Sequence, residues 1–258
     1  MSYQNCSMKL IIILIIIIIL FGFSEAKALT HVEPARFIIS AVPGQRRTGT
    51  IKVTNKGAEE IEVKAILYDW TLDRNDALVT AAAGTKTETL DELIKFNPRQ
   101  FKIDPGKTQV VRFTISAPKD LKVERRGIVF FEEETDLVEE SSGAKVVTQI
   151  GTAIYFVPTT AEFQFKLLGA KVEINETEDN LGLLLLRNEG AAHIRYTVNY
   201  KIINSTGALL DDSEVTEKVI LPNSTRVLAF PIKGDLPQGK YKIFLQIEFY
   251  GTNKEATY

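Results

Sequence analysis

Residues 96–113 read FNPRQFKIDPGKTQVVRF and contain two apolar segments joined by a turn. The Asp-Pro-Gly sequence at 104–106 is typical of a turn, because proline fixes φ and glycine tolerates positive φ. In the segment after the turn, Val111, Phe113 and Ile115 alternate with polar residues. Successive side chains of a strand point to opposite faces, so this segment is predicted to be a strand with one buried face.

The same pattern extends upstream and downstream of this stretch. Residues 50–54 alternate as Thr-Ile-Lys-Val-Thr, whereas the continuous apolar run at 128–131 is typical of a strand buried on both faces. Residues 146–157 form a long predicted strand that ends at Pro158. Residues 71–93 are mostly polar and are predicted to be irregular.

Residues 159–258 repeat this organisation, with a predicted strand at 194–203 and a turn at 188–190. Short strands separated by a turn about every 8–12 residues are typical of sandwiches and barrels. The sequence therefore predicts an all-β fold with two tandem immunoglobulin-like β-sandwich domains after an N-terminal signal peptide. We expect the signal peptide at 1–28 and the two domains at 29–158 and 159–258.

The N-terminal segment has the features of an export signal. Lys9 is followed by an apolar run at 10–23, which is shorter than the roughly 20 residues that a membrane-spanning helix needs. Small residues at alternate positions then form a candidate cleavage site, with cleavage after Ala28 or after Ala26. We expect a cleaved signal peptide and a periplasmic or secreted protein. The alternative interpretation is an uncleaved membrane anchor.

Composition and charge limit the kinds of partner. Cys6 is the only cysteine and lies within the expected signal peptide, so the mature domains are predicted to fold without disulfides. The net charge is -2, and Lys and Arg are mixed with Asp and Glu instead of forming a basic face. We therefore expect no nucleic-acid partner, no small-molecule cofactor, and membrane contact only through the signal peptide before cleavage.

The polar residues show no pattern typical of catalysis or metal binding. His31 and His193 are the only histidines, and neither has a nucleophile at a spacing that suggests a catalytic pair. The acidic run at 132–140 lacks the glycine and the alternating ligands of a calcium loop, so it is interpreted as a solvated hairpin loop. We expect no enzymatic activity, no metal and no cofactor.

Several segments resemble the periplasmic chaperones of bacterial pilus assembly, the PapD-like superfamily of two tandem immunoglobulin-like domains. Residues 31–38 (HVEPARFI) resemble the family's first strand, and residues 50–55 (TIKVTN) resemble its second. Residues 96–113 resemble the family's proline, apolar strand, Pro-Gly turn and Val-Arg-apolar run. Residues 125–131 (RRGIVFF) and 154–158 (IYFVP) resemble its later strands.

The resemblance implies a function and a set of site residues. Chaperones of this family bind exported β-rich subunits by strand addition, in which backbone hydrogen bonds supply the attraction. Arg36 matches the family's arginine that binds the subunit's terminal carboxylate, and Ala153 stands where the family has a lysine. Val146, Thr148 and Ile150 match the donor-strand edge. The alternative for Arg36 is a solvated or locally paired strand arginine.

The sequence departs from the family at two charged positions and leaves a second function open. Arg126 stands where the family has an acid and Val157 where it has an arginine, which puts the family's interdomain ion network in doubt.

The first hypothesis is a periplasmic chaperone-like protein for pilus or surface subunits. The alternative is a secreted structural or adhesive surface protein that uses its immunoglobulin-like domains as a spacer or a binding face.

Overall fold

A computed structural model describes the following parts of the chain: residues 30–73, 76–135, 146–173, 180–233, 236, 240–250 and 255–257. The expected signal peptide and both candidate cleavage sites lie outside these residues. The regular structure of the described residues consists of β-strands. They contain no helix long and apolar enough to span a bilayer.

The first sandwich is built from two sheets that together contain strands β1 to β10. The strands are β1 (Thr30–Glu33), β2 (Arg36–Ala41), β3 (Arg46–Asn55), β4 (Ile61–Leu72), β5 (Leu78–Ala82), β6 (Ile94–Asn97), β7 (Gln100–Ile103), β8 (Thr108–Ser116), β9 (Arg125–Thr135) and β10 (Val146–Pro158). One sheet has the order β1-β3-β8-β6. The other has the order β2-β10-β9-β4-β5, with β7 also paired to β4.

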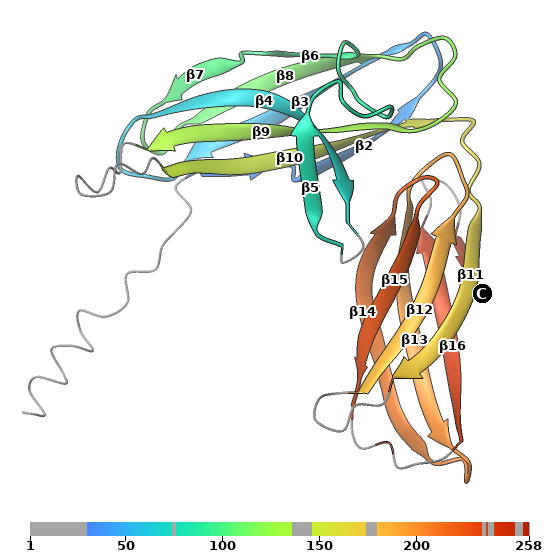
Figure 1. Ribbon diagram of the computed structural model, residues 1–258. Helices are drawn as coiled ribbons and strands as arrows, with labels where there is room; N and C mark the ends of the chain where they lie inside the picture. The colour runs from blue at the N-terminus through green and yellow to red at the C-terminus, as the bar shows by residue number, and fades with distance from the viewer. Residues whose placement is uncertain are drawn as a thin grey trace, which may run out of the picture.

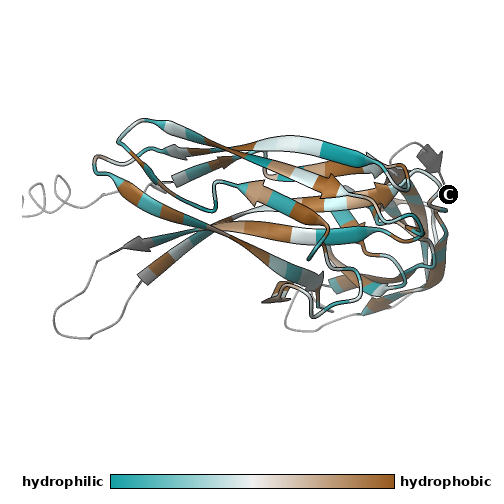
Figure 2. Cartoon of the chain, turned by 90° about the horizontal axis from the view of Figure 1, so that it is seen from above, coloured by the Kyte–Doolittle hydropathy of each residue, from teal (hydrophilic) through white to brown (hydrophobic). Residues whose placement is uncertain are grey.

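The core of the first sandwich follows the predicted alternation. Val111, Phe113 and Ile115 of β8 are buried between the sheets, as expected from their spacing. Strand β9 is buried on both faces, because Val129 points into this core and Ile128 packs in a separate cluster on the outer face. Figure 2 shows the resulting alternation of hydrophobic and hydrophilic residues along the strands.

Two sequence-based expectations for the first sandwich were wrong. Residues 78–82, expected to be irregular, form strand β5 and pair with β4. This strand leaves Leu78 and Val79 exposed, so it lacks the buried alternation that signals a strand. The acidic run at 132–140 was expected to be a solvated loop, but Glu133 lies in strand β9 and is buried. The Thr30 hydroxyl donates a hydrogen bond to its carboxylate at 2.5 Å.

The second sandwich has one three-stranded and one four-stranded sheet. Its strands are β11 (Phe165–Glu173), β12 (Asn180–Asn188), β13 (Ile194–Asn204), β14 (Leu209–Ile220), β15 (Thr225–Ile232), β16 (Tyr241–Tyr250) and β17 (Glu255–Thr257). The sheet orders are β11-β12-β15 and β14-β13-β16-β17. Leu186, Tyr196 and Ile202 are among its buried core residues. The predicted all-β fold with two sandwiches is confirmed.

A buried asparagine closes one corner of the first sandwich. The Asn55 amide nitrogen donates to the carbonyl oxygens of Glu59, at 2.6 Å, and Ile103, at 2.9 Å. Its amide oxygen accepts the Gly57 backbone N–H at 2.8 Å. The side chain therefore satisfies backbone groups from two segments that the sheet ladders leave unpaired.

The second sandwich repeats this corner with the same Asn-x-Gly sequence. The Asn188 amide nitrogen donates to the carbonyl oxygens of Ala192, at 2.8 Å, and Ile220, at 3.1 Å. Its amide oxygen accepts the Gly190 backbone N–H at 2.8 Å. Both asparagines are fully buried, so each corner depends on these hydrogen bonds for its polar groups.

The two sandwiches meet at an angle, and the β4–β5 hairpin projects from the first sandwich toward the second (Figure 1). Arg226 on β15 donates to the carbonyl oxygens of Leu72, at 3.0 Å, and of Asp73 in this hairpin. Its Nε also lies 3.5 Å from the Asp76 carboxylate. Because Arg226 is buried, these contacts tie the hairpin to the second sandwich.

Candidate functional site

One edge of β10 is partly open. Along its whole length up to Phe156, β10 pairs with β9 on one side. On the other side it pairs with β2 in parallel, but only from Ala153 to Pro158. Among the described residues, no strand pairs with this second side between Val146 and Thr152. An unpaired strand edge is a template for pairing with another chain.

The hydrogen-bond pattern shows which backbone groups face the open edge. The Ala153 N–H donates to the Ala35 carbonyl oxygen at 3.0 Å, so Ala153 directs its backbone groups toward β2. Backbone groups alternate in direction along a strand, and the register of β10 with β9 is continuous here. The N–H and C=O groups of Val147, Gln149 and Gly151 therefore project from the open edge.

The predicted donor-strand residues lie on this open segment of β10. Val146 begins the strand, Thr148 is exposed, and Ile150 is half-buried against the core of the first sandwich. Val147 is 44% exposed and points to the other face of the sheet. Sequence reasoning considered only one face and missed Val147.

Arg36 begins β2, directly beside Ala153 in the register of the sheet. Its side chain is 50% exposed, and its Nη1 lies 3.6 Å from Oε1 of Glu217 in the second sandwich. Arg36 therefore lies at the point where the open edge of β10 ends and β2 begins. The neighbouring Ala153 contributes no charge there.

A second arginine reaches the same carboxylate from the second sandwich. Arg195 on β13 donates from Nη2 to Oε1 of Glu217, the oxygen that faces Arg36. This hydrogen bond, followed by the charges of Arg195 and Arg36, lowers the pKa of the Glu217 carboxyl below its usual value. Sequence reasoning missed Arg195 and Glu217, because nothing in their local sequence indicates that they meet a residue of the first sandwich.

A buried pair of polar side chains lies deeper in the junction. Oε2 of Glu124 accepts the backbone N–H of His193 at 2.9 Å and lies 2.5 Å from the ring nitrogen Nδ1. The Glu124 N–H in turn donates to the Ala191 carbonyl oxygen at 2.8 Å. Both side chains are almost fully buried, so this pair links the sandwiches away from solvent.

Aromatic rings cover this buried pair. The Tyr155 ring packs on His193 with centroids 4.2 Å apart and meets the Trp70 ring edge-on at 5.4 Å. Burial and, secondarily, the Glu124 charge raise the pKa of Tyr155 to about 12. The phenol is therefore neutral at physiological pH and cannot serve as a base there.

The two positions at which the sequence departs from the family, Arg126 and Val157, lie close to the junction. Arg126 does not reach the second sandwich, since its Nε donates to the Trp70 carbonyl oxygen at 3.4 Å and its Nη2 lies 3.8 Å from Glu88. Val157 is buried in the apolar cluster of the junction. Other polar contacts join the two sandwiches, between Glu124 and His193 and between Arg36 and Glu217.

Each histidine lies beside a carboxylate, in very different surroundings. His31 is exposed beside Glu33 at 3.7 Å, and His193 is enclosed by Glu124 and Tyr155. Within the same residues, no group of three or more His, Cys, Asp or Glu side chains is placed to hold a metal ion.

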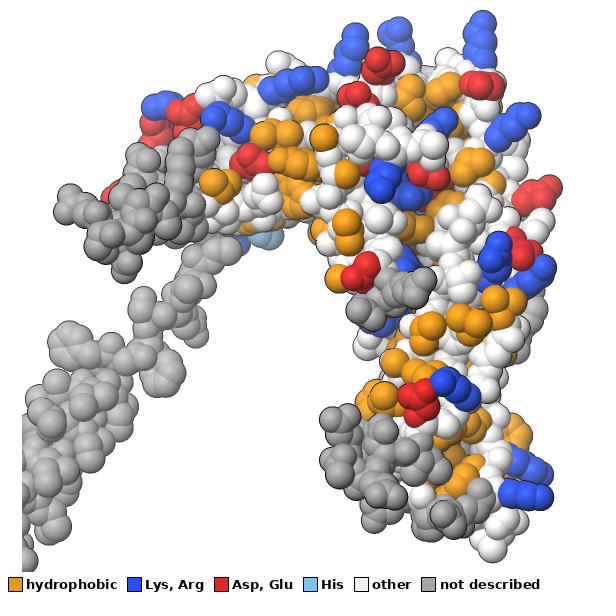
Figure 3. Space-filling model, in the orientation of Figure 1, with side chains coloured by type: hydrophobic (Ala, Val, Ile, Leu, Met, Phe, Trp, Pro, Cys, Tyr) orange, Lys and Arg blue, Asp and Glu red, His pale blue; other side chains and the backbone are white. Residues whose placement is uncertain are grey.

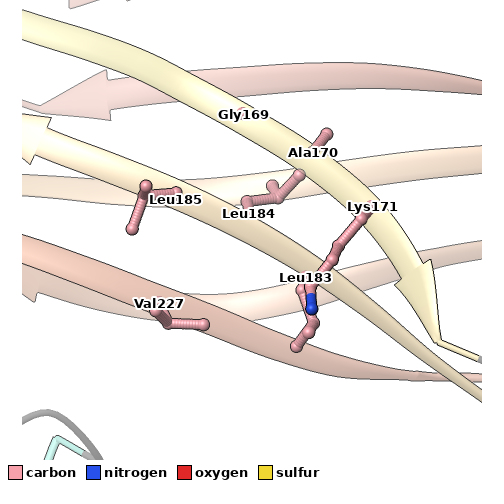
Figure 4. A pocket seen from close by; sticks show the side chains of 7 residues that line it. All are labelled: Gly169, Ala170, Lys171, Leu183, Leu184, Leu185 and Val227. Atoms are coloured by element: carbon pink, nitrogen blue, oxygen red, sulfur yellow. The ribbon is translucent and has the colours of Figure 1, made fainter.

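A second surface feature lies on the outer face of the β11-β12-β15 sheet. Leu183, Leu185 and Val227 line an apolar depression of about 420 Å³ together with Gly169 and Lys171 (Figure 4). Hydrophobic side chains are visible over this sheet in Figure 3. Leu185 and Val227 are 38% and 48% exposed on this face.

Comparisons with known proteins give the same fold. No family model matches the sequence, and no curated protein sequence matches it. The structure of the YadV chaperone is 13% identical with a TM-score of 0.50, and the match covers 89% of this chain and 98% of that chain.

Two further structures are similar at lower TM-scores. The class 5 fimbriae chaperone CfaA is 14% identical with a TM-score of 0.46, covering 84% of this chain and 98% of that chain. A Salmonella enterica complex of SafA pilin with the SafB chaperone is 13% identical with a TM-score of 0.44, covering 90% and 92%. The predicted resemblance is confirmed at the level of the fold by the YadV chaperone, whose TM-score is 0.50.

Proposed function

We propose that this protein is a periplasmic chaperone that binds exported β-rich subunits by strand addition to the open edge of β10. The observation that carries the proposal is the unpaired side of β10 between Val146 and Thr152. A guest strand there would gain hydrogen bonds from the backbone groups of Val147, Gln149 and Gly151. Backbone pairing of the guest strand with β10 would supply the affinity, and contacts with the side chains beside the open edge would supply the selectivity.

Two other features support this function. The fold is similar to that of the YadV chaperone over 89% of this chain and 98% of that chain. Arg36 lies at the end of the open edge, where it would bind the terminal carboxylate of a guest strand. The function requires neither a catalytic residue nor a cofactor, and it requires export through the expected signal peptide.

The test removes one hydrogen-bond donor from the open edge. Gln149→Pro deletes a backbone N–H that faces the guest, whereas Gln149→Ala removes the side chain and retains that N–H. A photo-crosslinking residue at Val147 is placed in wild type and in both variants, and each protein is crosslinked in its own cell envelope. We expect wild type and Gln149→Ala to capture the same secreted β-rich subunits and Gln149→Pro to lose them.

Equal capture by Gln149→Pro, with the variant folded by circular dichroism, would contradict strand addition at this edge. A proline at Ile150 is the comparison for folding, because the Ile150 backbone groups face β9 and their loss breaks the existing sheet.

The second candidate function is a surface protein that uses its sandwiches as a spacer or binding face. The apolar outer face of the β11-β12-β15 sheet favours it. If Leu185→Lys abolishes capture of a cell-surface component while Gln149→Pro has no effect, this function replaces the first.

A further inference from the structure

Gly151 lies on the open segment of β10 and has no side chain to place on the sheet face that points away from the core. Its N–H and C=O groups project from the open edge, so they do not bond to β9. Gly151 and its partner Phe130 on β9 therefore form a non-hydrogen-bonded pair, the arrangement that brings paired residues closest together. A glycine inside a strand is also typical of a site that another backbone approaches closely.

Two apolar side chains of β9 occupy the space over Gly151. A Cβ added at Gly151 would lie 2.7 Å from Cδ1 of Ile128 and 2.8 Å from Cε1 of Phe130. These atoms can stand there because residue 151 has no side chain. Ile128 and Phe130 thus extend the apolar surface of β9 over the strand that carries the open edge. We call these two side chains over Gly151 the apolar step.

Hydrogen bonds at the neighbouring position hold the apolar step in place. The Tyr68 ring on β4 meets the Phe130 ring edge-on, with centroids 5.5 Å apart. The Tyr68 hydroxyl donates to Oε1 of Glu132 at 3.1 Å, and Nε2 of Gln149 donates to the same oxygen at 2.7 Å. Phe130 therefore packs against a ring that is itself fixed by hydrogen bonding, and it is only half-buried in the free protein.

The other positions on this face of β10 are polar, filled or already paired. Gln149 presents an amide that is hydrogen-bonded to a carboxylate. Val147 fills its own position with a side chain that is 44% exposed. Ala153 is already paired with β2. Within the open segment, Gly151 is thus the position at which a guest side chain would meet the apolar residues of β9 directly.

The geometry of strand pairing fixes where a guest side chain would point. Residues paired across two strands direct their side chains to the same face of the sheet. A guest residue paired with Gly151 would therefore stand beside the apolar step. A large apolar side chain there would remove surface of Phe130 from water, whereas a charged one would lose its own hydration without gaining a partner.

We propose that the apolar step selects guest strands that carry a large aliphatic or aromatic side chain opposite Gly151 and a polar one opposite Gln149. This contact lies on the opposite face of β10 from the predicted donor-strand residues Val146, Thr148 and Ile150. The inference rests on the proposed strand addition for its guest. Strand addition does not depend on the step in return, because backbone pairing forms whatever side chains the guest carries.

The test compares peptides that differ only in the residue that faces Gly151. The probes are fluorescent, N-acetylated and C-terminally amidated heptapeptides with valine at odd and threonine at even positions, except for a central phenylalanine, leucine or alanine. The central residue shares a face with both threonines, so a peptide that sets a threonine against Gln149 sets the central residue against Gly151. Binding to the full mature chain is followed by fluorescence anisotropy. We expect the phenylalanine and leucine peptides to bind about tenfold or more tightly than the alanine peptide, the size expected for burying a large apolar side chain.

Two variants alter the step from its two sides. Phe130→Ser removes the ring and should bring the phenylalanine and leucine peptides down to the affinity of the alanine peptide. Gly151→Ala places a Cβ where the ends of Ile128 and Phe130 now lie, so it should displace them and reduce the preference at least several-fold. The affinity of the alanine peptide should be unchanged in both variants, which shows that each still folds with its edge open. Gly169→Ala is the matched control, because a Cβ at this strand glycine meets nothing within 4 Å, and it should keep the wild-type preference.

Gln149→Pro separates failure of the apolar step from failure of strand addition. Equal affinity of wild type for all three peptides, weakened equally by Gln149→Pro, would reject the step and leave strand addition standing. A preference that survives in both Phe130→Ser and Gly151→Ala would locate the selection elsewhere and also reject the step. Binding of no peptide, or binding that Gln149→Pro leaves unchanged, would reject strand addition at this edge and the step with it.

Discussion

Replacing Glu124 with alanine removes the buried carboxylate that joins the two sandwiches. His193 then loses the carboxylate oxygen that accepts its backbone N–H at 2.9 Å and lies 2.5 Å from its ring nitrogen Nδ1. Neither group gains access to water, because the side chains of both residues are almost fully buried. The protein is therefore left with polar groups that have been desolvated but not paired.

The expected cost follows from this geometry. Leaving one buried polar group unsatisfied costs about 1–3 kcal/mol, and Glu124→Ala removes two contacts at once, so we expect it to lose about 3–5 kcal/mol. Glu124→Gln keeps a side-chain oxygen as acceptor and loses the charge, which should cost roughly 1–2 kcal/mol. We therefore expect Glu124→Ala to lose more free energy of unfolding than Glu124→Gln, and this ranking is as informative as the two values.

Trp70 makes the measurement direct, because it is the only tryptophan and packs against Tyr155 at the junction. With a urea m-value of about 1–3 kcal/mol/M, Glu124→Ala should lower the midpoint of the Trp70 fluorescence transition by roughly 1–5 M. The exposed Glu59→Ala is the control and should change stability by less than about 0.5 kcal/mol. A free energy of unfolding for Glu124→Ala that differs from wild type by less than about 0.5 kcal/mol would refute the proposed role of the pair.

Three further predictions concern packing, corners and pH. Gly49→Ala should cost about 1–3 kcal/mol in urea unfolding, because its Cβ would lie 2.3 Å from the Phe113 ring, whereas Gly169→Ala meets nothing within 4 Å and should be nearly neutral. Asn188→Ala should cost about 2–5 kcal/mol by thermal unfolding, because three buried backbone groups lose their partners. The pKa of Glu217 is lowered in the folded state, so its stabilisation is present above the unfolded value of about 4.3 and is lost as pH falls through the folded value. The stability advantage of wild type over Glu217→Gln should therefore be seen at pH 7 and diminish as the pH falls below about 4.3.

Much of the fold was predictable because local pattern and burial agree. The alternation in β8 and the apolar run in β9 correspond to one and two buried faces, respectively. The turns at 55–57 and 188–190 were identified from their Asn and Gly residues, although not the hydrogen bonds that bury each asparagine. Strand β5 was missed because its side chains are mostly exposed and leave no amphipathic pattern.

The junction was much less predictable, because its contacts join residues that are distant in the chain. His193 considered alone is an isolated histidine, and only the folded chain shows Glu124 beside it. Arg36 was identified from the family resemblance, yet its partner Glu217 carries no local signal. The role of Arg195 depends on two sandwiches meeting at one angle, and alternation along a strand contains no information about that angle.

The open edge of β10 also bears on how the free protein behaves at high concentration. An unpaired edge takes any compatible strand, including the same edge of a second copy. Two copies joined this way would form a symmetric, closed pair in which each protects the other from aggregation. The concentration of paired copies would then depend on the concentration of guests by mass action, because a copy that binds a guest strand can no longer pair with a second copy.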